Sequence, residues 1–524
     1  MKKKVDRPRA WAAPENALIL QAFEWHVPAD RCHWNRLRTA LPGFKALGVD
    51  QIWIPPACKG MDANGNGYDI YDLFDLGEFD QKGCISTKWG SKKELQELVQ
   101  DARSLGMGII WDAVLNHKAG ADFPERFEAV KVNPEQRNVE ISKPLEVNGW
   151  VGFDFPGRGD QYSSMKYRWQ HFTGVDWDDK TKQNAIYKIH APEKDWALDV
   201  STENGNYDYL MFADLDHSHV QVREDLLNWG TWVTDELALG GMRLDAAKHI
   251  STGFQKEFVA HVQKTANPEF FVIGEYWTGN IRALLSYVED TEHTIAAYDV
   301  PLLEKFSKLS HAPRADLRGI FNDTLVQCRP DHAVTPVAPE FKEIAYALIL
   351  LRKDGFPCLF YGDLYGIRAN VPDPMTPACN GRLPILAQAR KLYAHGSQKD
   401  YFDQPNCIGS YAIPWNRDLS RLTVLLGFVR SGNDRHSSGL ACVISNAGMS
   451  KKRMFIGRGN KGQKWVDILQ HHNGSVTIDR CGYGKFPVRA MSVSVWVDSS
   501  AADLRSLQHN LYGHHPSPFT PTVA

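Results

Sequence analysis

The sequence SKKELQELVQDARSLGMGIIWDAVLNH, residues 91–117, has the pattern of an amphipathic helix followed by a buried strand. Ser91 and Glu94 have the spacing of a capping box, in which each side chain bonds the backbone of the other at a helix start. Apolar residues then recur on one helical face, at Leu95, Leu98, Val99 and Leu105. Gly106 closes the helix before the apolar run 108–111. With the earlier run 51–54, this segment predicts a strand–helix–strand crossover.

The same alternation recurs along most of the chain. The apolar runs that predict buried strands are residues 18–23, 51–54, 108–111, 241–245, 270–275 and 357–361. Helical periodicity fills intervals between them, for example over residues 222–237 and 340–353. This pattern is typical of an α/β protein whose parallel sheet is covered by helices, either as a closed barrel or as an open sheet.

Two regions break the alternation. Between residues 119 and 212, Gly, Asp, Trp and Tyr dominate without a helical period, which predicts an inserted domain instead of one long loop. After residue 388, short apolar runs such as 440–444 and 491–496 predict a separate all-β domain. The end of the chain, residues 501–524, is expected to be an unfolded tail.

Composition excludes several classes of protein. The 524 residues include 60 Lys and Arg against 62 Asp and Glu, so no net field favours nucleic acid or an anionic membrane as a partner. A hydrophobic content of 43% and an aromatic content of 11% exclude a disordered chain. The 16 Trp residues supply flat rings on which a neutral ligand such as a sugar could stack, although most such rings are core.

The cysteines and the N-terminal residues indicate the cellular compartment of the protein. Nine cysteines without CxxC pairs suggest reduced thiols instead of a disulfide framework or a zinc cluster. The N-terminus begins MKKK, but DRPR follows at residues 6–9 where a signal peptide needs an apolar stretch. No apolar run is long enough to cross a bilayer. We therefore expect a soluble, cytoplasmic protein.

Polar residues follow three of the predicted strands. In a barrel the carboxyl ends of the strands share one face, where catalytic groups gather. Taken singly, an Asp after a strand is more often a helix cap, and a lone His is usually a satisfied hydrogen-bonder. Their joint occurrence favours a site. The residues are Asp112, Asn116 and His117 after one strand, Arg243, Asp245, Lys248 and His249 after another, and Glu275 after a third.

Three segments carry a family resemblance. DAVLNHK (112–118), GMRLDAAKH (241–249) and VIGEYW (272–277) resemble three hallmark regions of the α-amylase family of glycoside hydrolases, in order and at suitable distances. Supporting matches are GYDIYDL (67–73), ENGNYDYL (203–210), FADLD (212–216) and FYGDLYG (360–366). The resemblance covers nearly all of residues 18–498 and looks closest to liquefying bacterial and intracellular fungal α-amylases.

The resemblance implies a fold. It is a (β/α)8 TIM barrel in two parts, residues 1–118 and 213–388. An irregular β-rich domain B, residues 119–212, is inserted after the third strand. A C-terminal β-sandwich would occupy residues 389–500.

The resemblance also implies a retaining mechanism with two carboxylates. Asp245 would be the nucleophile, kept ionised by Arg243, and Glu275 would be the protonated acid/base, about 5–5.5 Å away. The substrate-binding residues implied are Tyr68, as a stacking ring, His117 and Arg243 near the sugar that is cleaved, and Lys248 with His249 on the reducing side. The alternative for Tyr68 is plain core packing.

A calcium site is implied between the barrel and the insertion. Its ligands would be Asn116, Asp208, Asp214 and the backbone carbonyl of His249, a set of hard oxygen donors suited to Ca²⁺. Further metal-binding Asp residues of the liquefying relatives are matched here by Thr173 and Ala197. We therefore expect one calcium ion and not a cluster.

The match breaks at the family's fourth hallmark. An Asn-His-Asp motif should follow residues 332–335, but the chain runs directly into PVAPEFK, residues 336–342. The missing Asp is the third catalytic carboxylate, and its loss could cost ~10²–10⁴ in rate. Asp331 precedes the strand and is not expected to substitute. Relative to the family, residues 410–427 are an insertion of a size similar to the missing segment. The loss and the insertion could therefore both reflect mis-assigned exon boundaries. Sequencing the transcript across both junctions tests this hypothesis.

Three functions remain open from the sequence. The first is an α-amylase that hydrolyses internal α-1,4 bonds of starch, glycogen or maltooligosaccharides, impaired by the missing motif. The second is a non-hydrolytic α-glucan-binding or regulatory protein. The third is a 4-α-glucanotransferase, which would use the same carboxylates. In each case the expected partner is an α-glucan and the expected state is a monomer.

Overall fold

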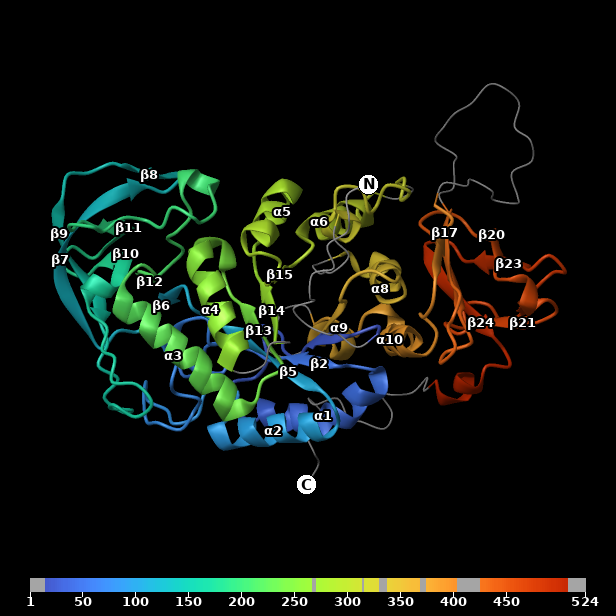
Figure 1. Ribbon diagram of the computed structural model, residues 1–524, viewed down its shortest axis with the longest axis horizontal. Coiled ribbons are helices and arrows are strands. Elements are labelled where there is room, and N and C mark those ends of the chain that lie inside the picture. The colour runs from blue at the N-terminus through green and yellow to red at the C-terminus, as the bar shows by residue number, and fades with distance from the viewer. Residues whose placement is uncertain are drawn as a thin grey trace, which may run out of the picture.

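A parallel seven-stranded sheet covered by helices lies at the centre of the molecule (Figure 1). The computed structural model describes residues 15–265, 270–312, 315–328, 337–367, 374–402 and 425–507. In spatial order the strands of this sheet are β15 (Ala296–Ala297), β14 (Phe271–Gly274), β13 (Gly241–Leu244), β5 (Gly108–Ala113), β2 (Gln51–Trp53), β1 (Ile19–Gln21) and β16 (Cys358–Phe360). Each neighbouring pair is parallel. The predicted α/β barrel fold is confirmed.

Helices follow the strands as the sequence predicts. They are α1 (His33–Leu47), α2 (Lys92–Ser104), α3 (Val220–Leu237), α4 (Thr252–Thr265), α5 (Ile281–Asp290), α6 (Val300–Ser310), α7 (Leu325–Cys328), α8 (Lys342–Leu350), α9 (Tyr361–Tyr365) and α10 (Leu383–Leu392). Both bonds of the predicted capping box are present at the start of α2. The helix expected over residues 340–353 is shorter, because a 3₁₀ turn, Pro339–Phe341, precedes α8 and the helix ends at Leu350.

The strands bury both faces, because side chains alternate between the barrel interior and the helical layer. Ile19, Ile110 and Ile273 belong to a cluster inside the barrel. Leu20 and Ile109 belong to the larger core between strands and helices. This double burial explains why the strands are continuous apolar runs in the sequence.

Among the described residues, β15 and β16 form the two edges of the barrel sheet. In chain order, the strand expected before the missing Asn-His-Asp motif lies between them, at residues 332–335. Those residues, Asp331 and the junction with Pro336 lie outside the described part of the chain. Most of the 410–427 insertion also lies outside it, although residues 425–427 begin β18.

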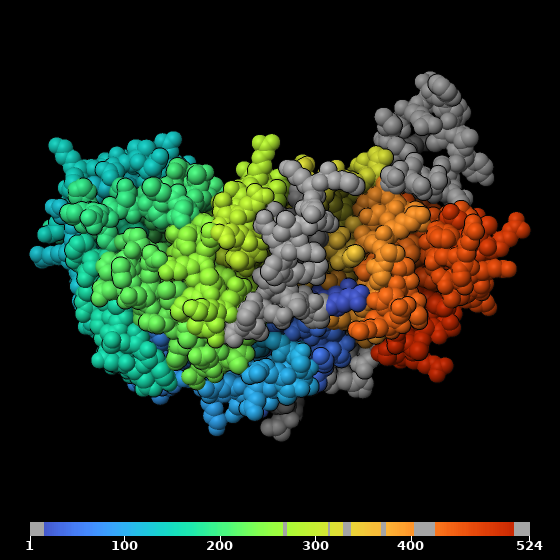
Figure 2. Space-filling view, viewed as in Figure 1, coloured from blue at the N-terminus to red at the C-terminus, as the bar shows by residue number. Residues whose placement is uncertain are grey.

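The predicted insertion forms a second, antiparallel sheet of seven strands at one end of the molecule (Figures 1 and 2). Its strands are β6 (His117–Lys118), β7 (Phe123–Asn133), β8 (Gln136–Glu140), β9 (Leu145–Gly152), β10 (Phe172–Asp178), β11 (Gln183–Ile189) and β12 (Ala213–Leu215). The short hairpin of β3 (Lys59–Gly60) and β4 (Ile70–Asp72) lies in the excursion after β2. β6 and β12 pair with each other, so the chain enters and leaves the insertion side by side.

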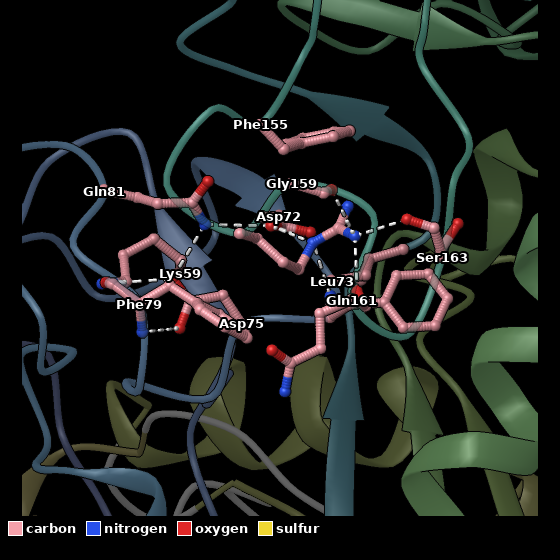
Figure 3. Close-up of polar contacts among 12 residues, drawn as sticks. Lys59, Asp72, Leu73, Asp75, Phe79, Gln81, Phe155, Gly159, Gln161 and Ser163 are labelled. Atoms are coloured by element: carbon pink, nitrogen blue, oxygen red, sulfur yellow. Dashed lines mark hydrogen bonds and ion pairs between the residues drawn. The ribbon is translucent and has the colours of Figure 1, made fainter.

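A buried charge cluster attaches the insertion to the β3–β4 hairpin (Figure 3). Asp72 accepts hydrogen bonds from Arg158 Nε at 2.7 Å and from Gln81 Nε2 at 2.9 Å. Gln81 also bonds Asp75, which is 3.2 Å from Lys59 Nζ. Arg158 donates further to the carbonyl oxygens of Gly159, Gln161 and Ser163. These bonds fix the loop over residues 155–163 against the barrel, because a buried charge is stable only when it is paired.

The all-β C-terminal region lies at the other end of the molecule (Figures 1 and 2). Its strands are β17 (Gln398–Asp400), β18 (Leu425–Arg430), β19 (Leu440–Ser445), β20 (Ser450–Phe455), β21 (Lys464–Asp467), β22 (Ser475–Thr477), β23 (Tyr483–Val488) and β24 (Ser492–Asp498). Six form one antiparallel sheet, and the β20–β23 pair packs on it through Met454 and Phe486.

The end of the chain differs from its prediction. A 3₁₀ helix, Ala502–Ser506, and the buried Leu507 extend the ordered structure past residue 501. The burial of Leu507 holds this segment against the core, and residues 508–524 lie outside the described part. The other 3₁₀ helices in the described ranges are Trp169–His171, Glu203–Gly205, Ala247–His249, Cys379–Gly381 and Arg458–Asn460.

Two further sequence expectations can be compared with the fold. The seven cysteines whose side chains the structure describes are free thiols: Cys32, Cys58, Cys84, Cys358, Cys379, Cys442 and Cys481. No helix in the described ranges has both the length and the apolar character needed to cross a bilayer.

Candidate active site

Three neighbouring strands bring the predicted catalytic residues together. β13 lies between β5 and β14, and Arg243 is level with Asp112 on one side and with Ile273 on the other. The ladder continues beyond the strand ends, since Asp245 N donates to the carbonyl of Ala113 at 3.0 Å and Glu275 N donates to that of Leu244 at 2.9 Å. Asp112, Asp245 and Glu275 therefore share the carboxyl face of the sheet.

One guanidinium holds all three carboxylates. Nη1 of Arg243 donates to Asp112 Oδ1 at 2.5 Å and to Asp245 Oδ1 at 2.9 Å. Nη2 lies 2.9 Å from Glu275 Oε1, and Glu275 Oε2 accepts from Ala246 N at 3.1 Å. Arg243 is 4% exposed, so these contacts are shielded from water. The arrangement fixes Asp245 and Glu275 side by side, facing one charged group.

The electrostatics differ from the sequence expectation. Burial raises the pKa of Asp245 to about 8, Arg243 opposes this rise, and Glu275 and Asp112 reinforce it. Burial likewise raises the pKa of Asp112. Arg243 stays charged, because the carboxylates outweigh its own burial and hold its pKa well above the usual range. Three carboxylates around one cation thus favour keeping a proton in the cluster, and in the unliganded site burial outweighs the guanidinium at Asp245.

Aromatic rings lie above this cluster. The hydroxyl of Tyr68 donates to Asp112 Oδ2 at 3.0 Å, so this ring is positioned by the site and is not plain core packing. The ring of Trp25 stacks on Tyr68 with centroids 6.0 Å apart and planes 9° apart, and it is 64% exposed. His117 Nε2 bonds the carbonyl of Tyr68 at 2.9 Å.

Sequence reasoning missed Trp25 and gave no role to Asp112. Both follow predicted strands, Trp25 after residues 18–23 and Asp112 after residues 108–111. The rule used for Asp245 therefore marks both positions. This rule does not predict which residues contact each other, because Trp25 and Tyr68 are brought together only by the tertiary fold.

Lys248 and His249 lie where the next turn meets the insertion. Lys248 Nζ donates to Glu203 Oε2 at 2.7 Å and to the carbonyl of Trp277 at 3.1 Å. His249 is buried, and its Nδ1 lies 2.7 Å from the carbonyl of Tyr207. Burial lowers the pKa of His249 to about 3, so its imidazole is neutral. Lys248 thus lies next to the strand end that carries Glu275, whereas the His249 ring is turned into the insertion.

Three of the predicted calcium ligands, Asn116, Asp208 and Asp214, lie where the barrel meets the insertion. Asn116 Nδ2 donates to Asp214 Oδ1 at 3.0 Å, and Thr173 Oγ1 donates to Asp214 Oδ2 at 2.5 Å. Asp208 Oδ2 accepts from the backbone of Ala197 at 3.1 Å. Thr173 and Ala197 are the two positions that lack a metal-binding carboxylate. Thr173 bonds Asp214 and Ala197 bonds Asp208, so each contacts one of the predicted ligands.

This donor set fits a hard cation. Asn116 Oδ1 is buried and has no hydrogen-bond partner among the described residues. Burial raises the pKa of Asp208 to about 8. Burial, together with the neighbouring Asp208, also raises the pKa of Asp214 well above its usual range. No group of three or more His, Cys, Asp or Glu side chains suited to a metal occurs in the described ranges. The set is instead two carboxylates and an amide oxygen, to which the resemblance adds the His249 carbonyl, and such mixed oxygen donors are what Ca²⁺ accepts.

A hollow of about 410 Å³ lies next to these groups, over the start of the insertion. Its lining includes Trp150, Trp177 and Phe212. Both indole nitrogens bond Asp179 Oδ1, at 3.3 and 3.4 Å. Phe212 packs against His117 with ring centroids 5.5 Å apart. The hollow therefore adjoins the rings of the carboxylate site.

Comparisons with known proteins show the family of the chain. The α-amylase catalytic domain family matches residues 33–298. Glucan 1,4-alpha-maltohexaosidase of Bacillus sp. (strain 707) is 42% identical over 501 residues, which cover 92% of each chain. Cytoplasmic alpha-amylase of Escherichia coli (strain K12) is 36% identical over 509 residues, 92% of this chain and 99% of that protein.

A solved structure shows the same fold. The α-amylase of Geobacillus thermoleovorans in complex with acarbose superposes with a TM-score of 0.59 and 16% identity, over 93% of this chain and 98% of that chain. Barrel, inserted sheet and paired carboxylates together define a glycoside hydrolase. Within that class, the chain belongs to the α-amylase family.

Proposed function

We propose that the protein is an α-amylase that hydrolyses internal α-1,4 bonds of starch, glycogen or maltooligosaccharides with retention. The observation that carries this proposal is that Asp245 and Glu275 bond the two terminal nitrogens of one Arg243 guanidinium. Such close placement suits the ~5–5.5 Å separation of a retaining pair better than the ~6.5–9.5 Å of an inverting pair.

In this mechanism Asp245 attacks the anomeric carbon and forms a glycosyl ester, while Glu275 gives its proton to the departing oxygen. Glu275 then removes a proton from the water that hydrolyses the ester. The reactive form needs an ionised Asp245 and a protonated Glu275. Burial favours a proton on Asp245 in the unliganded site, so substrate binding has to leave Asp245 ionised and the proton on Glu275 before the ester forms.

The rings supply the sugar-binding surface in this proposal. Tyr68 would stack on the sugar being cleaved, and His117 and Arg243 would contact it. Trp25 would extend the platform, because its exposed ring is parallel to Tyr68. Lys248 would contact sugars on the reducing side, while the buried ring of His249 makes that residue a structural neighbour of the metal site.

We propose one Ca²⁺ held by Asn116, Asp208, Asp214 and the carbonyl of His249. The orphaned amide oxygen of Asn116 is the observation that supports it. The ion would neutralise the two carboxylates and hold the insertion against the barrel, with no part in the chemical steps. A cytoplasmic monomer is proposed for the protein, in line with the name of the Escherichia coli relative, cytoplasmic alpha-amylase.

Turnover should be reduced, because no Asn-His-Asp motif follows residues 332–335. The same observation favours a second candidate, an α-glucan-binding protein without hydrolysis. A 4-α-glucanotransferase would share Asp245 and Glu275 and differ in excluding water from the ester.

A reducing-sugar assay on soluble starch separates these functions, with Asp245→Asn as the blank. We expect wild-type release above the blank, even if slow. Release equal to the blank, together with heat of binding for maltoheptaose, would support the binding protein and contradict the amylase. Products longer than maltotetraose from maltotetraose would indicate transfer.

A further inference from the structure

Lys194 is held in a pocket of oxygen atoms next to the proposed calcium site. Its ammonium donates to the carboxylate of Asp216 and to the backbone carbonyls of Gln170 and Phe172. The side chain of Lys194 is 10% exposed and that of Asp216 is 8% exposed. One carboxylate and two carbonyls are the donors that a hard metal ion takes, here bonded to an ammonium.

The backbone places this pocket beside the calcium ligands. Asp214 lies in β12 and Asp216 follows two residues later, so the two side chains leave the same face, about 7 Å apart along the chain. β10 pairs with β12, which brings the carbonyl of Phe172 opposite Leu215. Asp216 N also donates to the carbonyl of His171 at 3.0 Å. Two oxygen-lined cation positions therefore lie next to each other at this seam.

The charges balance if one position holds calcium and the other holds the lysine. Asp208, Asp214 and Asp216 contribute three negative charges in a largely buried region. Among the described residues, Lys194 is the only cation in an ion pair with any of these three carboxylates. One Ca²⁺ and one ammonium supply the three positive charges required, and an unbalanced buried charge would be costly.

We propose that Lys194 fills a second cation position as a built-in cation, so that this chain binds one Ca²⁺ where the same site without the lysine would bind two cations. The inference rests on the calcium site proposed above and deepens it. A tethered ammonium does not dissociate and needs no free ion, so Asp216 stays neutralised when calcium is scarce.

The test is the calcium stoichiometry of the full chain. Chelator-treated protein is titrated with CaCl2 in a calorimeter, in a choline chloride buffer, for wild type and Lys194→Ala. We expect one ion per wild-type chain and two per Lys194→Ala chain. A parallel titration with NaCl shows whether Na⁺ also fills the vacated position. The melting temperature of Lys194→Ala should fall in chelator and recover with the added ion.

Matched variants separate this effect from general damage. Lys194→Arg keeps the charge and should bind one calcium. Lys194→Ala with Asp216→Asn removes the need for a cation and should also bind one, which keeps the test available if Lys194→Ala folds only in high calcium. Lys188→Ala removes another lysine of the insertion, paired with Glu140 and Asp195, and should leave the stoichiometry at one.

Each outcome decides a different claim. Two tightly bound calcium ions in the wild-type protein would overturn the role of Lys194. The same holds if Lys194→Ala binds one calcium ion and responds to CaCl2 and NaCl as the wild type does. A wild-type chain that binds no calcium would overturn the calcium site itself. None of these results depends on starch hydrolysis, so the proposed activity stands or falls separately.

Discussion

The two acidic sites of this protein neutralise their charges in different ways. At the carboxyl ends of β5, β13 and β14, three carboxylates surround Arg243, a cation that belongs to the chain. At the seam with the insertion, Asp208 and Asp214 have no such cation among the described residues, and the Asn116 oxygen lacks a partner. The first site can be assembled by folding alone, whereas we propose that the second takes an ion from solution. The difference predicts that the Asp208–Asp214 site depends on calcium concentration and pH, whereas the Arg243 site does not depend on calcium.

The largest expected effect comes from removing the internal cation. Arg243→Met leaves the buried Asp112 and Asp245 and the partly exposed Glu275 without their cation, which should cost about 3–5 kcal/mol of stability. Activity should fall by at least about 10²-fold, because both catalytic carboxyls lose their common partner. Urea unfolding and starch hydrolysis measure the two effects. Arg223→Met breaks an exposed pair with Glu257 and is the control, with less than about 1 kcal/mol expected. If Arg223→Met lost as much stability and activity as Arg243→Met, the special role of the buried Arg243 would be contradicted.

Removing the external cation should have the next largest effect. With calcium at about 100–1,000 times its dissociation constant, the ion should add ~2.7–4.1 kcal/mol to the free energy of unfolding. A chelator should remove that increment, as measured by urea unfolding with and without calcium. Asp214→Asn should lose the response, whereas Asp154→Asn, at an exposed pair with Arg168, should keep it. A wild-type protein that is indifferent to the chelator contradicts the calcium site.

The calcium increment should also depend on pH. Without calcium, the pKa of Asp208 is raised to about 8, from about 3.9 in an unfolded chain. Between these values the folded state binds more protons than the unfolded state, so calcium-free stability falls as pH rises. Calcium requires the ionised carboxyl, so its affinity rises over the same range, up to about tenfold per pH unit. Melting curves from about pH 6 to pH 8 should show a widening gap between calcium and chelator, and a constant gap would refute this origin.

The smallest expected effect concerns the exposed edge of the active site. Trp25→Ala removes the ring that stacks on Tyr68 and should raise KM for starch about fivefold, since stacking contributes about 1 kcal/mol. The kcat should change little, because Trp25 does not contact the carboxylates. Steady-state kinetics separate the two constants. Met449→Ala, at another exposed apolar residue, should leave both unchanged.

Much of the fold could be predicted because each element follows from local pattern. The capping box at Ser91 and the apolar run that becomes β5 are encoded within a few residues, and both are present. The antiparallel insertion is less regular in sequence, so its pattern predicted only an inserted domain, and its β-rich character came from the resemblance. The ordered segment up to Leu507 was missed because its burial depends on contacts with distant parts of the core.

The sequence by itself determined the barrel pattern, the order of the strand-end residues and the absence of the Asn-His-Asp motif after residue 335. Only the tertiary structure decided that Arg243 meets three carboxylates, that Trp25 stacks on Tyr68, and that Lys194 sits on Asp216. The physical reason is that local pattern fixes which face a side chain takes, whereas its charge partners come from segments far away in the chain. The protonation of Asp245 depends on burial and on the balance of those partners, so it was the expectation that the fold changed most.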